Sequence, residues 1–383
     1  MSEPFALYVH VPWCRHVCGY CDFNKYASSA PPEADYVAAV LVELAACAAR
    51  EPWAGRPART LYLGGGTPSL FSPAAVGVLV DGVARTVGLT ADAEVTLEAN
   101  PGTVTRASLA GYRAAGVNRL SLGAASFQPP LLQTLGRDHA PEDIHDAVRD
   151  AVAVGFENLG LDLVFAVPGE TLAAWEADLA ATLALAPNHV SAYALTWEEG
   201  TPFHVWRARG RLRPIGDDLE ATMLETAIAT LGAAGYARYE VSSFARPGFA
   251  ARHNTAYWDG SDYLGLGAGA HSFSRTPAPG RRWVNARLPE RYLDAVRERG
   301  TAVDGEERLS EAQARAEFCF TGLRRATGID TAAFRRRFGL ELRAAFPHVA
   351  GLVADGLLEA DAERLRLTPR GFRFADSVSA TFV

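Results

Sequence analysis

The alternation of strand-like and helix-like segments constrains the fold of this chain more than any other feature. From residue 5 to about 245, short apolar runs alternate with Ala-rich segments of helical pattern. The runs expected to form strands are Phe5–Val11, Thr60–Leu63, Glu94–Glu98, Arg119–Leu122, Leu159–Val167, Val190–Leu195 and Arg238–Phe244. The segments expected to form helices are Asp35–Arg50, Pro73–Thr86, Arg106–Ala115, Pro141–Val154, Leu172–Ala186 and Asp218–Ala234. Such alternation favours parallel strands joined by right-handed crossovers, so the sequence predicts an α/β barrel or part-barrel.

Polar and glycine-rich stretches nearly all follow a predicted strand. The Cys14–Cys21 loop follows the first strand, Gly64–Ser69 ends the second, and Glu98-Ala-Asn100-Pro101 ends the third. Asp162 lies in the fifth strand and Thr196 follows the sixth. Because the loops after the strands of a β/α barrel share one face, these stretches are expected to converge on a single site.

After residue 245 the alternation stops. Residues 246–300 are rich in Gly, Pro and aromatic residues and are expected to be irregular. Residues 301–383 are expected to form a small helical domain with a β-hairpin wing. Its predicted helices are Glu311–Ala326, Thr331–Phe338 and Phe346–Asp355, and its predicted hairpin strands are Leu357–Ala360 and Arg364–Thr368. The predicted organisation is a core of residues 1–245, the irregular segment and this C-terminal domain.

Three cysteines lie close together, at Cys14, Cys18 and Cys21. A loop with this spacing can place three thiolates at three corners of a cubane iron–sulfur cluster and leave the fourth iron without a protein ligand. The alternative is a closed zinc site with three cysteines and one histidine, for which His10 or His16 could serve.

The remaining composition argues against several functions. The formal net charge is -7 and no large basic field is present, so nucleic-acid binding is not expected as the main function. The N-terminus lacks a positive region, and the apolar run after it stops at Pro12, which is too short for a signal peptide or a membrane span. We therefore expect a cytoplasmic protein, in which Cys47 and Cys319 are buried small hydrophobes rather than disulfide partners.

Several stretches together resemble one known superfamily. They are Tyr8-Val-His10-Val-Pro12-Trp13, the Cys14–Cys21 loop with Asp22-Phe23-Asn24, Gly64–Ser69, Glu98-Ala-Asn100-Pro101, Asp162-Leu163, His253-Asn254-Thr-Ala-Tyr257-Trp258 and Asp262–His271. The chain resembles the radical S-adenosylmethionine superfamily over nearly its whole length. Within it, the chain looks like the branch that contains the oxygen-independent coproporphyrinogen III oxidase HemN and the heme chaperone HemW.

The resemblance implies a fold and a set of cofactor contacts. The fold is a radical-SAM partial (β/α) barrel with a small helical, winged C-terminal domain. The cysteines are expected to hold a [4Fe-4S] cluster whose open iron binds S-adenosylmethionine. The residues that match cofactor-binding positions of the family are Tyr8, Gly65, Gly66, Thr67, Glu98, Arg137 and Asp162. Tyr8 is expected near the adenine, and the glycine turn near the amino group of the methionine.

Two departures separate this chain from the oxidase. Gly123-Ala124-Ala125-Ser126-Phe127 stands where the family usually has Gly-Val-Gln-Ser-Phe, so Ala125 replaces a glutamine that resembles part of a second S-adenosylmethionine site. Alanine has no side-chain hydrogen bond to offer. Phe23 stands where the oxidase has a further cysteine. Both changes favour the chaperone over the oxidase.

A heme iron would need an axial ligand, for which the sequence offers nine histidines. His253 is the preferred candidate because Asn254, Tyr257 and Trp258 supply polar and flat apolar surface beside it. His271, after a glycine-rich run, is the second candidate. The sequence does not distinguish axial ligation from a structural use of either histidine.

The function expected from the resemblance is that of a heme chaperone, which binds the cluster, S-adenosylmethionine and heme and passes heme to an acceptor protein. A flavodoxin or ferredoxin is the expected electron donor. The alternatives are a coproporphyrinogen-oxidase-like enzyme, a HemN-like radical methyl or methylene transferase, and a DNA-binding regulator suggested by the winged domain. The residues leave open whether any tetrapyrrole is turned over.

Overall fold

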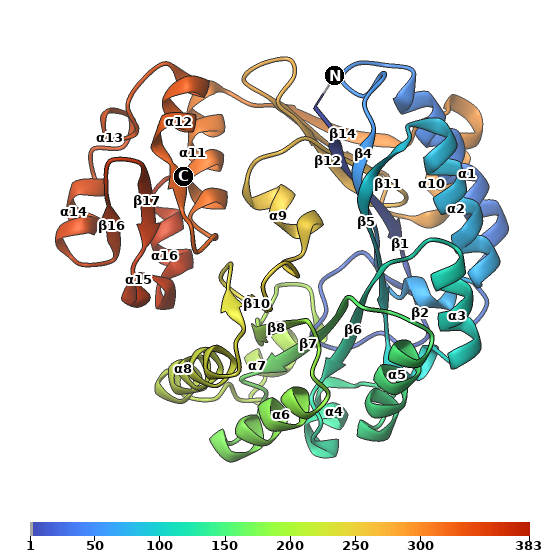
Figure 1. The fold of residues 1–383 in the computed structure, drawn as a ribbon, viewed down its shortest axis with the longest axis horizontal. Helices are drawn as coiled ribbons and strands as arrows, with labels where there is room; N and C mark the ends of the chain where they lie inside the picture. The colour runs from blue at the N-terminus through green and yellow to red at the C-terminus, as the bar shows by residue number, and fades with distance from the viewer. Residues whose placement is uncertain (1–2) are drawn as a thin grey trace.

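The computed structural model describes residues 3–383, which contain one large curved sheet and a separate small C-terminal domain (Figure 1). The sheet has twelve strands in the order β14-β13-β12-β11-β1-β4-β5-β6-β7-β8-β10-β9. Its strands lie along an arc with helices on the convex side, and the arc does not close (Figure 1). The fold is therefore an open part-barrel, as the sequence predicts.

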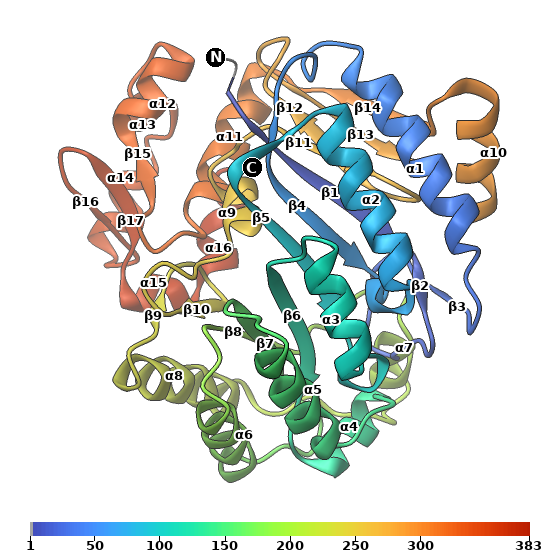
Figure 2. The same ribbon diagram turned by 45° about the vertical axis from the view of Figure 1, so that its right-hand side comes forward.

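The central strands of the arc are parallel and follow the predicted alternation. They are β1 (Phe5–Val11), β4 (Ala58–Gly65), β5 (Leu89–Ala99), β6 (Arg119–Ala125), β7 (Leu159–Phe165) and β8 (His189–Ala194). The helices between them are α1 (Glu33–Ala48), α2 (Pro73–Thr86), α3 (Arg106–Ala114), α4 (Pro129–Leu135), α5 (Pro141–Ala153) and α6 (Leu172–Ala184). Figure 2 shows α1, α2, α3 and α5 side by side along the outer face of the sheet.

Each parallel strand has an apolar outer face and a more polar inner face. In β6, the outer residues Leu120 and Leu122 are fully buried in the main core, whereas Arg119 and Ser121 face inward and line a cavity. Because successive side chains of a strand point to opposite faces, this alternation packs the leucines against the helices and presents the polar groups inside the arc. The register places Glu98 beside Ser121 and Asp162 beside Ser191, so polar groups of neighbouring strands form layers.

The prediction of a seventh parallel strand at Arg238–Phe244 is wrong. The chain forms two short antiparallel strands there, β9 (Ala237–Arg238) and β10 (Ser243–Ala245), and β10 pairs with β8. A tight turn separates them, in which the Arg238 guanidinium donates to the Val241 carbonyl and the Ser242 N–H donates to Glu240 Oε1. These local hydrogen bonds reverse the chain direction, so the parallel series ends at β8.

The expectation that residues 246–300 are irregular is also wrong. The segment contains α9 (Arg252–Trp258), β11 (Tyr263–Leu266), β12 (His271–Ser274), β13 (Arg281–Asn285) and α10 (Pro289–Arg299). β11 pairs in parallel with β1, and β12, β13 and β14 (Val303–Arg308) extend the same sheet in antiparallel order. The glycines in this segment hide its strand pattern, because glycine is more typical of loops than of strands. At Gly265 glycine is required, since a Cβ there would lie 2.1 Å from the His271 carbonyl oxygen.

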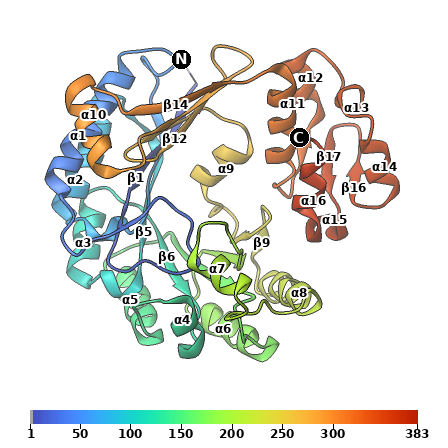
Figure 3. The same cartoon turned by 180° about the vertical axis from the view of Figure 1, so that it is seen from behind.

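The C-terminal domain has its own core, which includes Cys319, Phe334 and Leu365. Its helices are α11 (Glu311–Gly322), α12 (Thr331–Phe338), α13 (Leu342–Ala345), α14 (Val349–Ala354), α15 (Pro369–Arg373) and α16 (Ala375–Ala380). Its small antiparallel sheet has the order β15 (Ile329–Asp330), β17 (Arg364–Leu367) and β16 (Leu358–Ala360). The predicted helices and hairpin are present, with shorter first and third helices. Seen from behind, the domain stands at the open side of the arc, with α9 between it and the strands (Figure 3).

The remaining elements connect these parts. They are β2 (Trp13–Cys14), β3 (Tyr26–Ala27), the 3-10 turns Pro68–Leu70 and Pro101–Thr103, α7 (Pro202–Ala208) and α8 (Asp217–Ala233). Within residues 3–383, no helix combines the length and the apolar character that a bilayer crossing requires.

Candidate functional site

The three clustered cysteines line one cavity inside the arc. They lie on the loop between β1 and α1, which the pairing of Trp13 with Tyr26 closes. Cys14, Cys18 and Cys21 all line a cavity of about 390 Å³. Cys47, in α1, and Cys319, fully buried in the C-terminal core, are not among its lining residues. The structure therefore separates the clustered cysteines from the two isolated ones, as the sequence predicts.

The donor set on this loop fits an iron–sulfur cluster. Among residues 3–383, no three His, Cys, Asp or Glu side chains gather closely enough to hold a single metal ion. A cubane cluster needs its three thiolates farther apart than the ligands of a single ion, because each thiolate binds a different iron. The Arg137 Nη1 lies 4.0 Å from Cys18 Sγ, where a cation can offset the negative charge of bound thiolates. Burial raises the pKa of the Cys14 and Cys21 thiols, so metal binding has to displace their protons.

The glycine turn packs against the chain's own backbone. Gly66 N–H donates to the Val11 carbonyl at 2.8 Å, and Thr67 N–H donates to the Trp13 carbonyl at 2.7 Å. A Cβ at Gly66 would lie 2.6 Å from the Trp13 carbonyl oxygen. Glycine is thus required here for close approach to the residue before Cys14, and these two N–H groups are already used. Gly65, with a φ of 113°, Gly66 and Thr67 nevertheless all line the cavity.

Glu98 stands at the centre of the cavity wall. It accepts hydrogen bonds from the Tyr62 hydroxyl at 2.6 Å and from the Gly65 N–H at 2.9 Å. Burial raises the pKa of Glu98 to about 7, although both hydrogen bonds act in the opposite direction. This carboxyl can therefore gain or lose a proton near neutral pH.

Arg137 and Asp162 complete the predicted cofactor contacts on this wall. Arg137 Nη2 donates to Asn100 Oδ1 at 2.7 Å and to the Gly123 carbonyl, which fixes the guanidinium beside Cys18. Asp162 accepts from the Ser121 hydroxyl at 2.8 Å, and burial raises the pKa of its carboxyl. Both residues line the cavity, so the structure brings them together with the cysteines.

Tyr8 is placed differently from the other predicted cofactor residues. It is not among the residues that line the cavity. Its hydroxyl lies 2.9 Å from His10 Nδ1, and its ring stacks on Tyr62 with the ring centres 6.1 Å apart. His10 Nε2 in turn lies 2.7 Å from the carbonyl oxygen of Asn24. Tyr8 thus supports the wall and links β1 to the end of the cysteine loop.

The five residues predicted to contact heme do not form one surface. Asn254 lines the cavity, and His271 is exposed on β12. His253 is only 1% exposed, and its ring nitrogens lie 2.8 Å from the Thr60 hydroxyl and 2.8 Å from the Tyr257 hydroxyl. Burial lowers the pKa of His253 to about 3. Trp258 lies under the Arg324 guanidinium, 4.5 Å from the ring centre. In this conformation His253 is a hydrogen-bonded core histidine rather than an open ligand.

Sequence reasoning missed several polar residues of the cavity. Arg119, Ser121, His189, Ser191 and Tyr193 line it from the inner faces of β6 and β8. A periodic pattern in the sequence could have identified these residues. Polar residues occupy every second position of strands that are covered by helices on one side. Such positions must face away from the helices.

Comparisons with known proteins agree with this geometry. Residues 8–181 match the Radical SAM superfamily, and residues 309–374 match the HemN C-terminal domain. The chain is 35% identical over 382 residues to the heme chaperone HemW of Bacillus subtilis, covering 99% of both chains. It is 35% identical over 385 residues to the heme chaperone HemW of Escherichia coli, covering 99% of this chain and 98% of that one.

The chain belongs to the HemW family.

A solved structure shares the fold. Coproporphyrinogen III oxidase (HemN) from Escherichia coli, described as a radical SAM enzyme, matches with a TM-score of 0.83 at 24% identity. The match covers 99% of this chain and 90% of that chain. At this identity the likeness supports the architecture of the HemW-family chain and not a shared reaction.

Ala125 has an unusual backbone conformation in the cavity wall of this HemW-family chain. It lines the cavity with a φ of 62°, in a left-handed region that alanine rarely adopts. The following residues are held by Asp178, which accepts from the Ser126 hydroxyl at 2.5 Å and from the Phe127 N–H at 2.9 Å. The small side chain leaves no polar group at this point of the wall. Phe23, beside Cys21, also lines the cavity and is 58% exposed.

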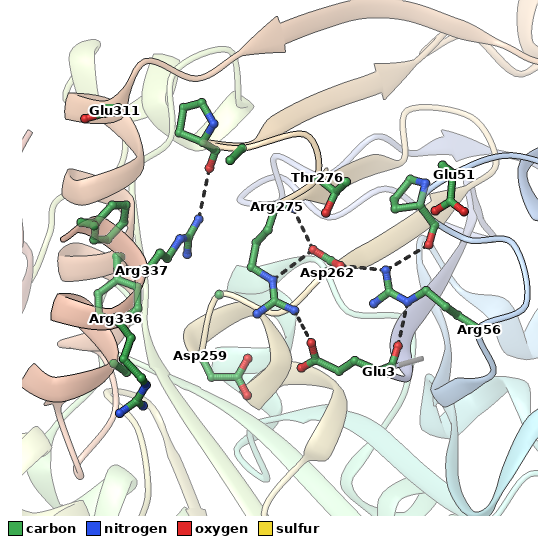
Figure 4. Close-up of a pocket in the computed structure, with 17 residues that line it drawn as sticks. Glu3, Glu51, Arg56, Asp259, Asp262, Arg275, Thr276, Glu311, Arg336 and Arg337 are labelled. Carbon is green, nitrogen blue, oxygen red and sulfur yellow. Dashed lines mark hydrogen bonds and ion pairs between the residues drawn. The ribbon is translucent and has the colours of Figure 1, made fainter. Parts of the chain in front are cut away.

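A second cleft, of about 830 Å³, lies where the main sheet meets α11 and α12 (Figure 4). Asp262 lies between two arginines there, and accepts from Arg56 Nη1 at 2.9 Å and from Arg275 Nε at 3.2 Å. Burial acts to raise the pKa of Asp262, but the hydrogen bonds and charges of Arg275 and Arg56 outweigh it and leave the pKa below its ordinary value. Arg337 reaches the cleft from α12 and donates to the Pro279 carbonyl at 3.4 Å. Because its central charges are paired within the chain, this cleft is a weaker candidate than the cysteine-lined cavity.

Proposed function

We propose that this HemW-family chain is a heme chaperone that holds a [4Fe-4S] cluster and S-adenosylmethionine in the central cavity, binds heme beside them and passes it to an acceptor protein. One observation carries the proposal. A single cavity joins the three cysteines to Glu98, Arg137 and Asp162 and extends to Asn254 on α9. The two HemW relatives, similar over their whole length, bear the same name.

Each cavity residue has a proposed task. Cys14, Cys18 and Cys21 hold three irons, and Arg137 offsets negative charge beside Cys18. Glu98 accepts hydrogen bonds from the amino group or ribose of S-adenosylmethionine, and Asp162 supplies a second carboxyl on the same wall. When bound, the cluster and S-adenosylmethionine supply one-electron chemistry, for which a flavodoxin or ferredoxin is the proposed electron donor. We place this protein in the cytoplasm.

The proposed heme contacts surround α9. Asn254 faces the cavity, and His253 and Tyr257 lie directly behind it. For His253 to bind iron, one of its two ring nitrogens has to give up its hydrogen bond. Release of the bond to Thr60 on β4 requires movement of α9, and release of the bond to Tyr257 requires rotation of a side chain within α9. His271 is exposed already and needs no such movement. The two histidines therefore predict different behaviour and can be told apart by mutation.

Heme titration of the anaerobically reconstituted protein tests the proposal. We expect a saturable Soret change in the wild type, with a shifted spectrum or weaker binding in His253→Ala and an intact cluster. His271→Ala is the matched variant. If the heme spectrum changes in His271→Ala and not in His253→Ala, the iron ligand is His271 on β12. If the wild type gives no saturable heme binding, the chaperone proposal fails.

A turnover assay separates the chaperone from an oxidase. Ala125 removes a polar contact from the wall, and Phe23 stands where the oxidase has a further cysteine. We expect negligible conversion of coproporphyrinogen III to protoporphyrinogen IX with S-adenosylmethionine and a reductant under anaerobic conditions. Products are resolved by chromatography, and repeated turnover would overturn the assignment.

A further inference from the structure

The wall of the central cavity holds an arginine that no carboxylate of residues 3–383 contacts directly. Arg119, the first residue of β6, lines the cavity and is only 1% exposed. Its Nε has no hydrogen-bond partner in the part of the chain that the structure describes, and its guanidinium forms no direct ion pair with a carboxylate of those residues. At longer range its positive charge acts to lower the pKa of Glu98 and of Asp162. Arginine is seldom buried so completely without a direct ionic partner.

A second unpartnered nitrogen lies beside this arginine. His189, the first residue of β8, is also 1% exposed, and its Nδ1 has no partner among residues 3–383. Its Nε2 lies 2.8 Å from the Tyr239 hydroxyl, which already accepts from the Ala251 N–H. That hydroxyl can therefore donate to Nε2, and the matching tautomer carries its proton on Nδ1.

Gly160 lies between the His189 ring and the Arg119 guanidinium. A Cβ at Gly160 would lie 3.3 Å from His189 Nδ1 and 3.4 Å from Arg119 Nη2. The sheet register sets Gly160 directly opposite His189, and Arg119 lies on the neighbouring strand. Both donors thus flank a position that has no side chain of its own.

The carboxyls of the cavity are engaged elsewhere. Glu98 is bound by the Tyr62 hydroxyl and the Gly65 N–H, and Asp162 by the Ser121 hydroxyl. A buried guanidinium that no carboxylate contacts directly is poorly solvated, and a carboxylate in fork geometry would offset that cost. The chemistry that fits two such donors in the wall of one cavity is a carboxylate.

We propose that Arg119 and His189 form a carboxylate-binding subsite in the wall of the cavity, and that heme occupies it with one propionate. The heme assignment rests on the proposed function. The subsite itself rests on the two unpartnered donors alone.

Binding titrations of Arg119→Gln test the subsite, with hemin, hemin dimethyl ester and S-adenosylmethionine as probes on the reconstituted protein. We expect hemin to bind the variant at least about tenfold more weakly, as for loss of a charge-assisted pair. The dimethyl ester, which has no carboxylate, should bind wild type and variant equally. Equal losses for hemin and its ester, or no loss for any probe, would overturn the proposal.

The third probe separates the sources of the carboxylate. If only S-adenosylmethionine binding weakens, the subsite stands but the heme assignment is wrong. If the wild type does not bind hemin at all, the proposed function fails, and the S-adenosylmethionine titration alone decides the subsite.

Two further variants control for folding. Arg56→Gln removes another buried arginine, one that lines the outer cleft, and should leave all three affinities unchanged. Gly160→Ala keeps both donors but narrows the space between them, and should weaken hemin binding without changing ester binding. Unchanged hemin binding in Gly160→Ala together with unchanged binding in Arg119→Gln would exclude the subsite.

Discussion

Glu43 gives the sharpest test of how this structure responds to pH. It lies in α1, is 2% exposed, and connects this helix to the turn after β11, to β13 and to α10. Its carboxyl accepts from the Gly267 N–H at 3.0 Å, the Asn285 side-chain amide at 2.6 Å and the Tyr292 hydroxyl at 2.7 Å. Burial raises the pKa of Glu43 to about 7, despite these hydrogen bonds. The folded protein therefore holds a proton on this carboxyl that the unfolded chain releases.

The sign and size of the effect follow from that pKa. Below pH 4.5 Glu43 is protonated in both states and does not oppose folding. As the pH rises from 4.5 to about 7, the unfolded chain loses this proton first, so the free energy of unfolding falls. One pKa unit corresponds to about 1.4 kcal/mol, so a change from 4.5 to about 7 removes about 3 kcal/mol of stability by pH 8.

The assay is urea unfolding of the wild type and Glu43→Gln between pH 5 and 8. Glutamine cannot ionise, so we expect the variant to lose about 2.5 kcal/mol less stability than the wild type between pH 5 and 8, since part of the total effect has already occurred at pH 5. Glu290→Gln, at an exposed position on α10, is the control and should follow the wild type. Parallel stability curves for the wild type and Glu43→Gln would refute the reasoning.

Three other perturbations follow from the geometry. Cys18→Ala should lose most of the iron and sulfide of the reconstituted cluster, whereas Cys319→Ala should retain it; iron analysis that shows full content in Cys18→Ala would contradict the ligand assignment. In Gly66→Ala, the added methyl group would clash with the Trp13 carbonyl just before the cysteine loop. We expect this variant to lose about 1–3 kcal/mol of stability and to show lower cluster content and lower S-adenosylmethionine affinity. Unchanged S-adenosylmethionine affinity in equilibrium dialysis would contradict this expectation. Asp262→Ala leaves the buried Arg56 without a carboxylate and Arg275 with Glu3 alone, and should cost about 3–5 kcal/mol in urea unfolding. A loss below about 1 kcal/mol would show that solvent or another acid replaces the carboxylate.

The sequence alone determined the features whose causes are local. The spacing of Cys14, Cys18 and Cys21 predicts a cluster loop because one short segment can place three thiolates around one cubane. Alternating apolar runs and helices predicted the parallel strands from β1 to β8 because each element buries its own face. The apolar helical setting of Cys319 predicted its burial.

The tertiary structure decided the features that depend on neighbours distant in the chain. Residues 263–285 form strands because β1 offers an edge to which β11 can pair, and no local pattern records that edge. His253 is closed because Thr60 and Tyr257 hydrogen-bond to its two nitrogens, and Thr60 lies 193 residues away in the sequence. Arg119 and His189 meet only because the arc brings β6 and β8 to either side of Gly160. A sequence specifies which groups are available for such contacts, but the packing of strands and helices decides which polar atoms are paired and which remain free to bind a ligand.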